Sequence, residues 1–350
     1  MKTTRRIFLG LGAAIAAVAI AKIPGEMVAE AQSGGAINLY SARHYDTDTA
    51  IYEGFTKQTG IKVNLIEAPA DKLIERIKSE GSNSPADVLL TVDAGNLWRA
   101  QEAGLLMPVD SAALKQAVPS NLRDPQGHWF GLSKRARVIV YNKDQVKPSE
   151  LSTYEDLANP KWKGKFIIRS SSNVYNQSLV GALLAALGPE KTTTWAKGVV
   201  ANFARPPQGN DTAQIKAVAA GEGALTLVNT YYVVRLMKSQ KPADQAIASK
   251  IGVFFPNQGD RGTHINISGG GVVKTTKNKE SAVKFLEYLA SPAAQKIFAE
   301  GNNEYPVLDN ATTDSKLKSL GEFKEDSVNA AEFGRRNQAA LKLMDTVGWK

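Results

Sequence analysis

Strand-like and helix-like runs alternate along this chain, and this alternation constrains the fold more than any other feature of the sequence. The run AINLYS at 36–41 is strand-like, and the segment after it places Ile51 and Phe55 at helical spacing. Strand-like runs return at 61–68 and 86–93, each followed by a helix-like pattern. Alternation at this spacing predicts an α/β fold with a parallel sheet.

A second set of alternating runs begins near residue 135. It contains strand-like, helix-like and mixed segments in the order 135–143, 159–170, 177–188, 212–229 and 269–301. The helix-like run QSLVGALLAALG ends in a glycine that we expect to stop it. No repeat, low-complexity tract or long linker separates the two sets. We therefore expect crossing strands, and not a flexible tether, to join them.

The N-terminus is typical of an export signal. Residues 1–31 start with a basic segment containing Arg5 and Arg6, continue with an apolar stretch at 7–20, and end in small residues that suggest cleavage after Ala31. The paired arginines resemble the twin-arginine signal of proteins that are exported already folded. An ordinary secretory signal with adjacent arginines is the alternative.

Charge and cysteine content narrow the class of protein further. The full chain has a net charge of +9, and residues 1–31 carry four Lys or Arg and two Glu, so the mature chain keeps +7. Nucleic-acid motifs are absent from the sequence, so we expect no nucleic-acid partner. The chain has no cysteine, which excludes disulfides, thiolate metal sites and a lipid-anchored cysteine. An unanchored exported protein favours the periplasm, and roughly 320 mature residues favour two domains.

Tyrosines and one histidine gather in loops that follow predicted strands. His44 and Tyr45 follow the first strand, Tyr175 precedes the apolar helix, and the doublet Tyr231 and Tyr232 follows the strand-like run ALTLVN. In open α/β sheets, ligands bind outside the carboxyl ends of the strands. An isolated tyrosine at such a place usually serves packing. Their occurrence at three such loops instead indicates a binding site.

The chemistry of phenolate points to iron. Tyrosinate is a hard, anionic oxygen ligand that suits Fe³⁺. A free phenol has a pKa of about 10, but the field of a bound cation can drive its deprotonation. Three or four tyrosinates would nearly cancel a charge of +3, which lowers the cost of holding the ion in a partly desolvated cleft. An imidazole nitrogen could complete the ligand set.

Several motifs together resemble the periplasmic ferric-iron-binding proteins of ABC importers, of the FutA type, which are related to the FbpA proteins. The similarity extends over essentially the whole mature chain, and the motifs follow the family order. The segments that carry it are LYSARHYDTD, NPKWKGK, SSSNVYNQS, NTYYVVRL, SGGGVVKTTKNKESAVKFLEYLASPAAQ and NNEYPV.

The resemblance implies an iron-binding transport protein and not an enzyme. It assigns His44, Tyr45, Tyr175, Tyr231 and Tyr232 as the iron ligands. Members differ in whether the histidine binds directly or whether water or an anion takes its place, so the role of His44 is left open. The cargo would be Fe³⁺, with Fe²⁺ conceivable. A monomer would deliver it to an ABC permease in the inner membrane.

The resemblance also implies the class II periplasmic binding protein fold, with two α/β lobes and a hinge of crossing strands. We expect lobe 1 to comprise 32–134 and 268–305, and lobe 2 to comprise 135–267 and 306–350. The histidine and the first tyrosine would then face the other three tyrosines across a cleft. Ligands on both lobes would be brought together by hinge closure.

Two arginines are candidates for charge compensation around a site with four tyrosinates. Arg235 lies four residues after Tyr231 and three after Tyr232, so all three share one face if this segment is helical. Arg135 lies at the expected crossover between lobes. We expect both to act from outside the ligand set.

Other features of the sequence have less specific interpretations. His128 and His264 have no neighbouring ligands at metal spacing, so loop or hinge packing is the better interpretation. The glycines of SGGGVV lack the spacing of a dinucleotide fingerprint, and we expect them to permit a bend at the crossover. Asp46 and Asp48 are typical of a helix start.

Two other functional classes remain open from the sequence. A periplasmic binder of an organic solute, such as a sugar or polyamine, could use Tyr231 and Tyr232 as stacking faces. An exported enzyme with a tyrosinate-bound iron is the second alternative. Catalytic iron needs an open position for substrate, and five protein ligands leave little room for one.

Overall fold

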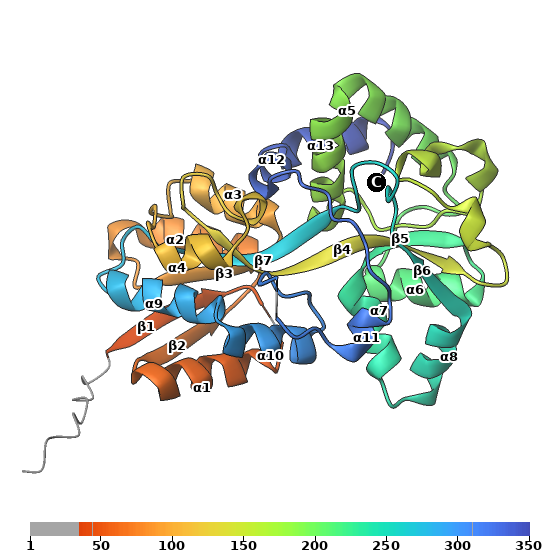
Figure 1. Cartoon of the computed structure of the whole chain (residues 1–350). Helices are drawn as coiled ribbons and strands as arrows, with labels where there is room; N and C mark the ends of the chain where they lie inside the picture. Colours follow the sequence, from red (N-terminus) through yellow and green to blue (C-terminus); the bar gives the residue numbers. More distant parts are fainter. Residues whose placement is uncertain (1–34, 44, 310) are drawn as a thin grey trace, which may run out of the picture. The chain divides into compact units, whose positions relative to one another are not determined.

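The computed structural model describes residues 35–350 apart from His44 and residue 310 (Figure 1). The predicted export signal at 1–31 lies outside the described residues and stays a prediction. His44, one of the expected iron ligands, also lies outside them.

Seven strands form the sheet of the described chain. Their order is β2-β1-β3-β7-β4-β5, and β6 also pairs with β4. The strands are β1 (Ala36–Ser41), β2 (Lys62–Glu67), β3 (Val88–Val92), β4 (Phe130–Asn142), β5 (Leu225–Asn229), β6 (Ile251–Phe254) and β7 (Ile265–Val272).

The expected parallel sheet is found for β1, β2 and β3 but not for the other strands. β1 pairs with β2 and β3 in parallel, whereas β7 runs antiparallel to β3 and β4, and β4 runs antiparallel to β5 and β6. The alternation of strand and helix patterns correctly predicts the parallel direction of the first three strands. Strand direction in the rest depends on where β7 re-enters the sheet, and local sequence patterns do not encode that position.

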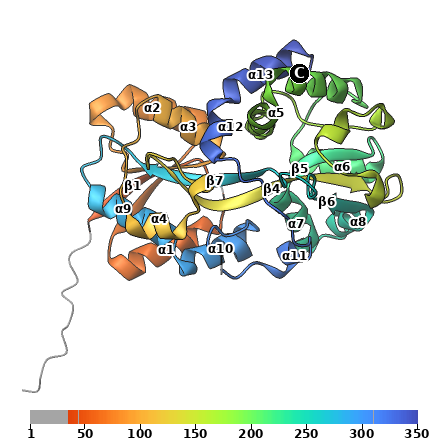
Figure 2. The same cartoon turned by 45° about the horizontal axis from the view of Figure 1, so that its top comes forward.

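The long strand β4 connects the two groups of strands. Its first part pairs with β7, from Phe130 opposite Gly270 to Ala136 opposite Ile265. Its second part, rich in β-branched residues, pairs with β5 and β6. Figures 1 and 2 show β4 and β7 side by side through the middle of the described chain. These are the crossing strands that the sequence led us to expect.

The glycines of β7 have a different role from the expected bend. None of them has a positive φ. A Cβ on Gly271 would lie 2.3 Å from the carbonyl oxygen of His128, and one on Gly269 would lie 2.5 Å from that of Phe130. Glycine is therefore needed here because the neighbouring backbone passes too close for any side chain.

Helices cover both faces of the sheet. Figures 1 and 2 place α2 and α3 on one side and α1 and α10 on the other. The helices are α1 (Asp48–Thr59), α2 (Ala70–Glu80), α3 (Ala94–Glu102), α4 (Ala112–Ala117), α5 (Val174–Ala201), α6 (Asp211–Ala220), α7 (Thr230–Lys238), α8 (Pro242–Lys250), α9 (Lys279–Leu289), α10 (Pro292–Asn302), α11 (Ser315–Lys318), α12 (Ala330–Arg335) and α13 (Asn337–Thr346).

One expectation about the chain before and within α5 is confirmed, and another is wrong. The apolar helix does stop at its glycine: Gly188 has φ 78°, and α5 is kinked there before Pro189 resumes it. The strand expected to end at Ser170 does not form, because only Phe166 makes isolated bridges, to Phe203 and Leu225. Among the described helices, none combines the length and hydrophobicity that a membrane span requires.

Candidate metal centre

Local capping and chain direction bring the predicted tyrosines to the ends of their elements. Tyr45 follows β1. Tyr175 lies in the first turn of α5, whose cap Asn173 accepts a hydrogen bond from the Tyr175 backbone N–H at 3.2 Å. Tyr231 and Tyr232 occupy the first turn of α7, which starts directly where β5 ends. The helical interpretation of the tyrosine doublet is therefore correct.

The structure brings these four tyrosines together. The Tyr231 hydroxyl donates a hydrogen bond to the Tyr175 hydroxyl at 3.2 Å. The ring of Tyr231 lies 6.5 Å from that of Tyr45, edge to face, and 4.3 Å from that of Tyr232. Within the described part of the chain, no group of three or more His, Cys, Asp or Glu could hold a metal. The tyrosine cluster, with its hard oxygen ligands, is therefore the candidate metal site.

Burial makes three of these phenols, those of Tyr45, Tyr175 and Tyr231, harder to deprotonate than a free phenol. Burial raises the pKa of Tyr45, Tyr175 and Tyr231 above its ordinary value. Neighbouring tyrosines raise the pKa of Tyr175 and Tyr231 further, and the Arg135 guanidinium opposes all three shifts. Deprotonation therefore needs a strong positive charge among the hydroxyls, which a trivalent cation supplies.

Arg135 lies beside the cluster as expected, but one end of its guanidinium is already held by neighbouring side chains. It is 1% exposed, and its guanidinium carbon lies 5.7 Å from the ring centroid of Tyr231. Its Nη2 donates hydrogen bonds to Glu304 and to the Ser268 hydroxyl. The second candidate, Arg235, is exposed and lies over the ring of Tyr232 at 5.8 Å.

Two charged residues of the cluster's surroundings were missed in the sequence. Arg43 is buried, lies 4.8 Å over the Tyr45 ring, and pairs with Asp48 and Glu304. Burial alone would raise the pKa of Glu304, but Arg135 and Arg43 outweigh it, and the pKa falls below its usual range. The signal available was position: Arg43 adjoins the histidine-tyrosine pair, and Glu304 lies in the family motif NNEYPV.

A second buried charge network lies beneath Tyr175 and was also missed. Asp211 is fully buried and accepts from Arg137 at 2.7 Å and from Arg169 at 3.0 Å. The guanidinium carbons of these arginines lie 5.8 Å and 5.5 Å from the Tyr175 ring. Asp211 also accepts from the backbone N–H of Asn229, the residue that caps α7. This network therefore ties the tyrosine-bearing ends of α5 and α7 together.

The other two histidines lie apart from the tyrosine cluster. The Nδ1 atom of His128 lies 2.8 Å from Asp124 Oδ2. His264 is 3% exposed and packs edge to face against Phe333. Burial, together with nearby Arg137 and Arg261, lowers the pKa of His264 to about 3, so it is neutral at physiological pH. These environments fit the packing roles that the sequence suggested.

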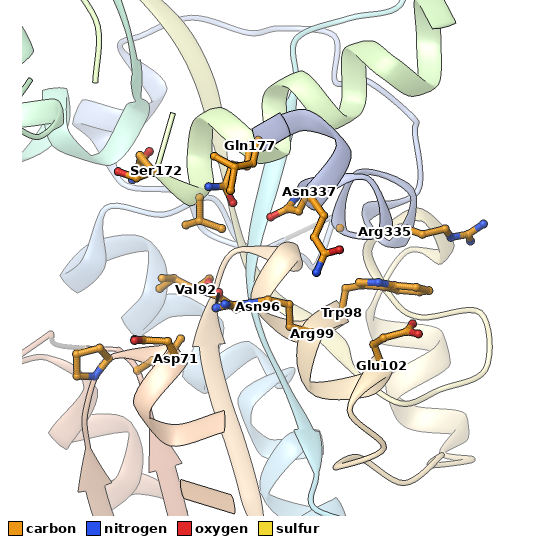
Figure 3. Close-up of a pocket in the computed structure, with 18 of the residues that line it drawn as sticks. Asp71, Val92, Asn96, Trp98, Arg99, Glu102, Ser172, Gln177, Arg335 and Asn337 are labelled. Carbon is orange, nitrogen blue, oxygen red and sulfur yellow. Dashed lines mark hydrogen bonds between the residues drawn. The ribbon is translucent and has the colours of Figure 1, made fainter. Parts of the chain in front are cut away.

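A cleft with a volume of about 1060 Å³ lies next to the segments that carry Tyr45 and Tyr175. Figure 3 shows its lining side chains, among them Asn96 and Arg99 from α3, Gln177 from α5, and Asn337 from α13. Ala42 and Val174, which lie near Tyr45 and Tyr175 in the chain, also line it. The volume is slightly above the usual range of small-molecule sites, and none of the four tyrosines lines the cleft.

Comparisons with known proteins agree with this chemistry. A model of the family described as bacterial extracellular solute-binding protein matches residues 50–325. The sequence is 56% identical over 364 residues to Iron uptake protein A1 of a Synechocystis strain, covering 100% of this chain and 99% of that protein. It is 33% identical over 326 residues to the Fe(3+)-binding periplasmic protein of Serratia marcescens, covering 93% of each. A solved structure described as Trichodesmium IdiA (FutA) in complex with iron and citrate ligands has a TM-score of 0.89 and 67% identity, covering 90% of this chain and 100% of that one.

Proposed function

Because the chain belongs to the family of bacterial extracellular solute-binding proteins, we propose that it is a periplasmic binding protein that captures ferric iron and delivers it to an ABC transporter permease. The structural similarity confirms the expected fold class, that of the two-lobed periplasmic binding proteins. The single observation that carries the function is the convergence of four tyrosines at the ends of β1, β5 and the first turn of α5. Relatives named for iron uptake and for Fe(3+) binding support the choice of metal.

We propose Tyr45, Tyr175, Tyr231 and Tyr232 as the oxygen ligands, with His44 as the fifth. Four tyrosinates carry four negative charges against the three of Fe³⁺, which leaves one negative charge for nearby arginines to offset. Fe²⁺ would leave two unless one tyrosine kept its proton.

The proposed lobes are 32–134 with 268–305, and 135–267 with 306–350. The change of partner along β4, from β7 to β5 and β6, supports a boundary near residue 135. Iron that contacts both lobes would favour the closed arrangement, because the open one offers it fewer ligands. The permease in the inner membrane would then recognise the closed monomer.

The periplasmic location follows from the character of the relatives, and we propose that a twin-arginine signal cleaved near Ala31 directs export. We assign the protein no catalytic role. Iron held by five protein ligands has little space for an exchangeable substrate, which a metal catalyst requires.

Titration of the purified mature protein with ferric iron tests this function. We expect one equivalent to produce a visible phenolate-to-iron charge-transfer band, because tyrosinate bound to ferric iron absorbs visible light and the chain has no cysteine thiolate to give a similar band. Anaerobic titration with ferrous iron serves as the comparison and should give no such band. Absence of the band and of tight binding under both conditions would reject the iron function in favour of an organic solute.

Removing Arg235 should weaken iron retention modestly. The side chain is exposed and lies over the Tyr232 ring, so Arg235→Ala should lower ferric affinity by about fivefold or less, the size expected for an exposed charge. The loss should shrink at high salt. Arg76→Ala is the matched control, because Arg76 lies in the same way over Tyr40, away from the cluster. Competition with a chelator measures both, and equal effects would remove Arg235 from the mechanism.

A further inference from the structure

A turn of the backbone after α10 brings Glu304 to the arginines beside the tyrosine cluster. Helix α10 ends at Asn302, and Asn303 then adopts a left-handed conformation with φ 60°. The next residues are held to β4 by two backbone hydrogen bonds of 2.8 Å between Tyr305 and Lys134. This turn places the Glu304 carboxylate, with no exposed surface, next to Arg135.

Four donors hold this carboxylate in one orientation. Oε1 accepts from Arg135 Nη2 and, at 3.3 Å, from the Ser268 hydroxyl. Oε2 accepts from the Ser133 hydroxyl at 2.7 Å and from Arg43 Nη1 at 3.2 Å. Both oxygens are therefore fully used, and the carboxylate cannot turn without breaking bonds to two different arginines.

The same contacts fix the arginine that faces the tyrosines. Glu304 and Ser268 occupy Nη2 of Arg135, while its Nε and Nη1 are buried and have no hydrogen-bond partner among the described residues. Buried polar groups are normally partnered, and exceptions call for an explanation. The guanidinium lies against the Tyr231 ring, so two donor nitrogens, Nε and Nη1, remain available close to the tyrosines on which negative charge would develop.

Resting on the proposed iron function, we propose that Glu304 is a positioning residue of the iron site. It holds the Arg135 guanidinium against the tyrosines, so that the unused N–H groups can stabilise tyrosinate charge when iron binds. Its own charge also matters, because Glu304 and Asp48 together balance Arg43 and Arg135. The charges of these four residues sum to zero, so this part of the surroundings acts through orientation, whereas Arg137, Arg169 and Asp211 together leave one positive charge beside Tyr175.

The spectrum of the ferric complex tests this role in Glu304→Gln, which keeps the size of the side chain. We expect the charge-transfer band to shift and iron transfer to a competing chelator to quicken by about 10- to 100-fold, the range for residues that orient metal ligands. Glu155→Gln is the matched control, because Glu155 also pairs with an arginine, Arg261, away from the tyrosines. A purely structural role would lower the melting temperature and leave the band in place.

Two further variants keep the test decisive. Ser133→Ala removes one hydrogen-bond donor to Glu304 without changing any charge. It should therefore shift the band in the same direction as Glu304→Gln, but by a smaller amount. If Glu304→Gln does not fold, the band of Ser133→Ala tests the positioning role instead. In an Arg135→Met background, Glu304→Gln should have little added effect, because the two act as a unit. An unshifted band in the folded variants, or additive effects with Arg135→Met, would overturn the role. A wild-type protein without any band would instead reject the iron function itself.

Discussion

The variant Tyr231→Phe, Tyr232→Phe is expected to lose the visible ferric band and at least about 100-fold in iron affinity. Residues that only orient a ligand already cost 10- to 100-fold when changed, and this variant removes two of the four proposed oxygen ligands. It also deletes the 3.2 Å hydrogen bond from Tyr231 to Tyr175. Iron titration followed at the charge-transfer wavelength measures the effect.

Phenylalanine keeps the packing of both rings, which lie 4.3 Å apart, so the folded state should survive. Tyr141→Phe provides the control, since Tyr141 lies on β4 and pairs with Gly252 of β6, outside the cluster. Each single variant should retain part of the band. Full iron binding by the double variant would exclude the tyrosine doublet from the site.

Loss of Asp211 is expected to destabilise the fold by about 3–5 kcal/mol, the cost of leaving buried charges without their partner. Asp211→Ala would strand Arg137 and Arg169, which are 2% and 17% exposed at the side chain. It would also leave the Asn229 backbone N–H without its acceptor. The free energy of unfolding in urea, measured without iron, gives the magnitude.

Asp110→Ala is the control for this change, because Asp110 pairs with Lys115 while its side chain is 87% exposed. An exposed pair contributes about 0–1 kcal/mol, so this variant should unfold almost as the wild type does. A loss of stability at Asp211 no larger than that at Asp110 would show that the buried arginines find other partners or water.

The sequence was informative wherever the relevant interactions are local. Strand-like runs followed by helical periodicity located β1, β3 and β5 with the helices after them, whereas the helical turn at Tyr231 and Tyr232 was one of two conformations that the sequence allowed. Those patterns depend on side-chain spacing over a few residues. The tyrosines could be nominated together because the carboxyl ends of neighbouring strands gather at one edge of a sheet.

Errors arose where partners are distant in the chain. The antiparallel course of β7 depends on where it enters between β3 and β4. Likewise, Glu304 contacts Arg43, 261 residues away. The motif NNEYPV marks Glu304 by family resemblance, but local sequence patterns do not show its burial or its partners, because elements that meet only in the folded protein create them.

The amino-acid sequence by itself thus determined the α/β class, the three loops that carry tyrosine and the preference for a hard trivalent cation, because element propensity and ligand chemistry belong to the residues themselves. Only the tertiary structure decided that four phenols meet, that burial holds the pKa of Tyr45, Tyr175 and Tyr231 high, and that Arg135 is bound by Glu304. Distances, desolvation and ion pairing between remote segments exist only once the chain has folded.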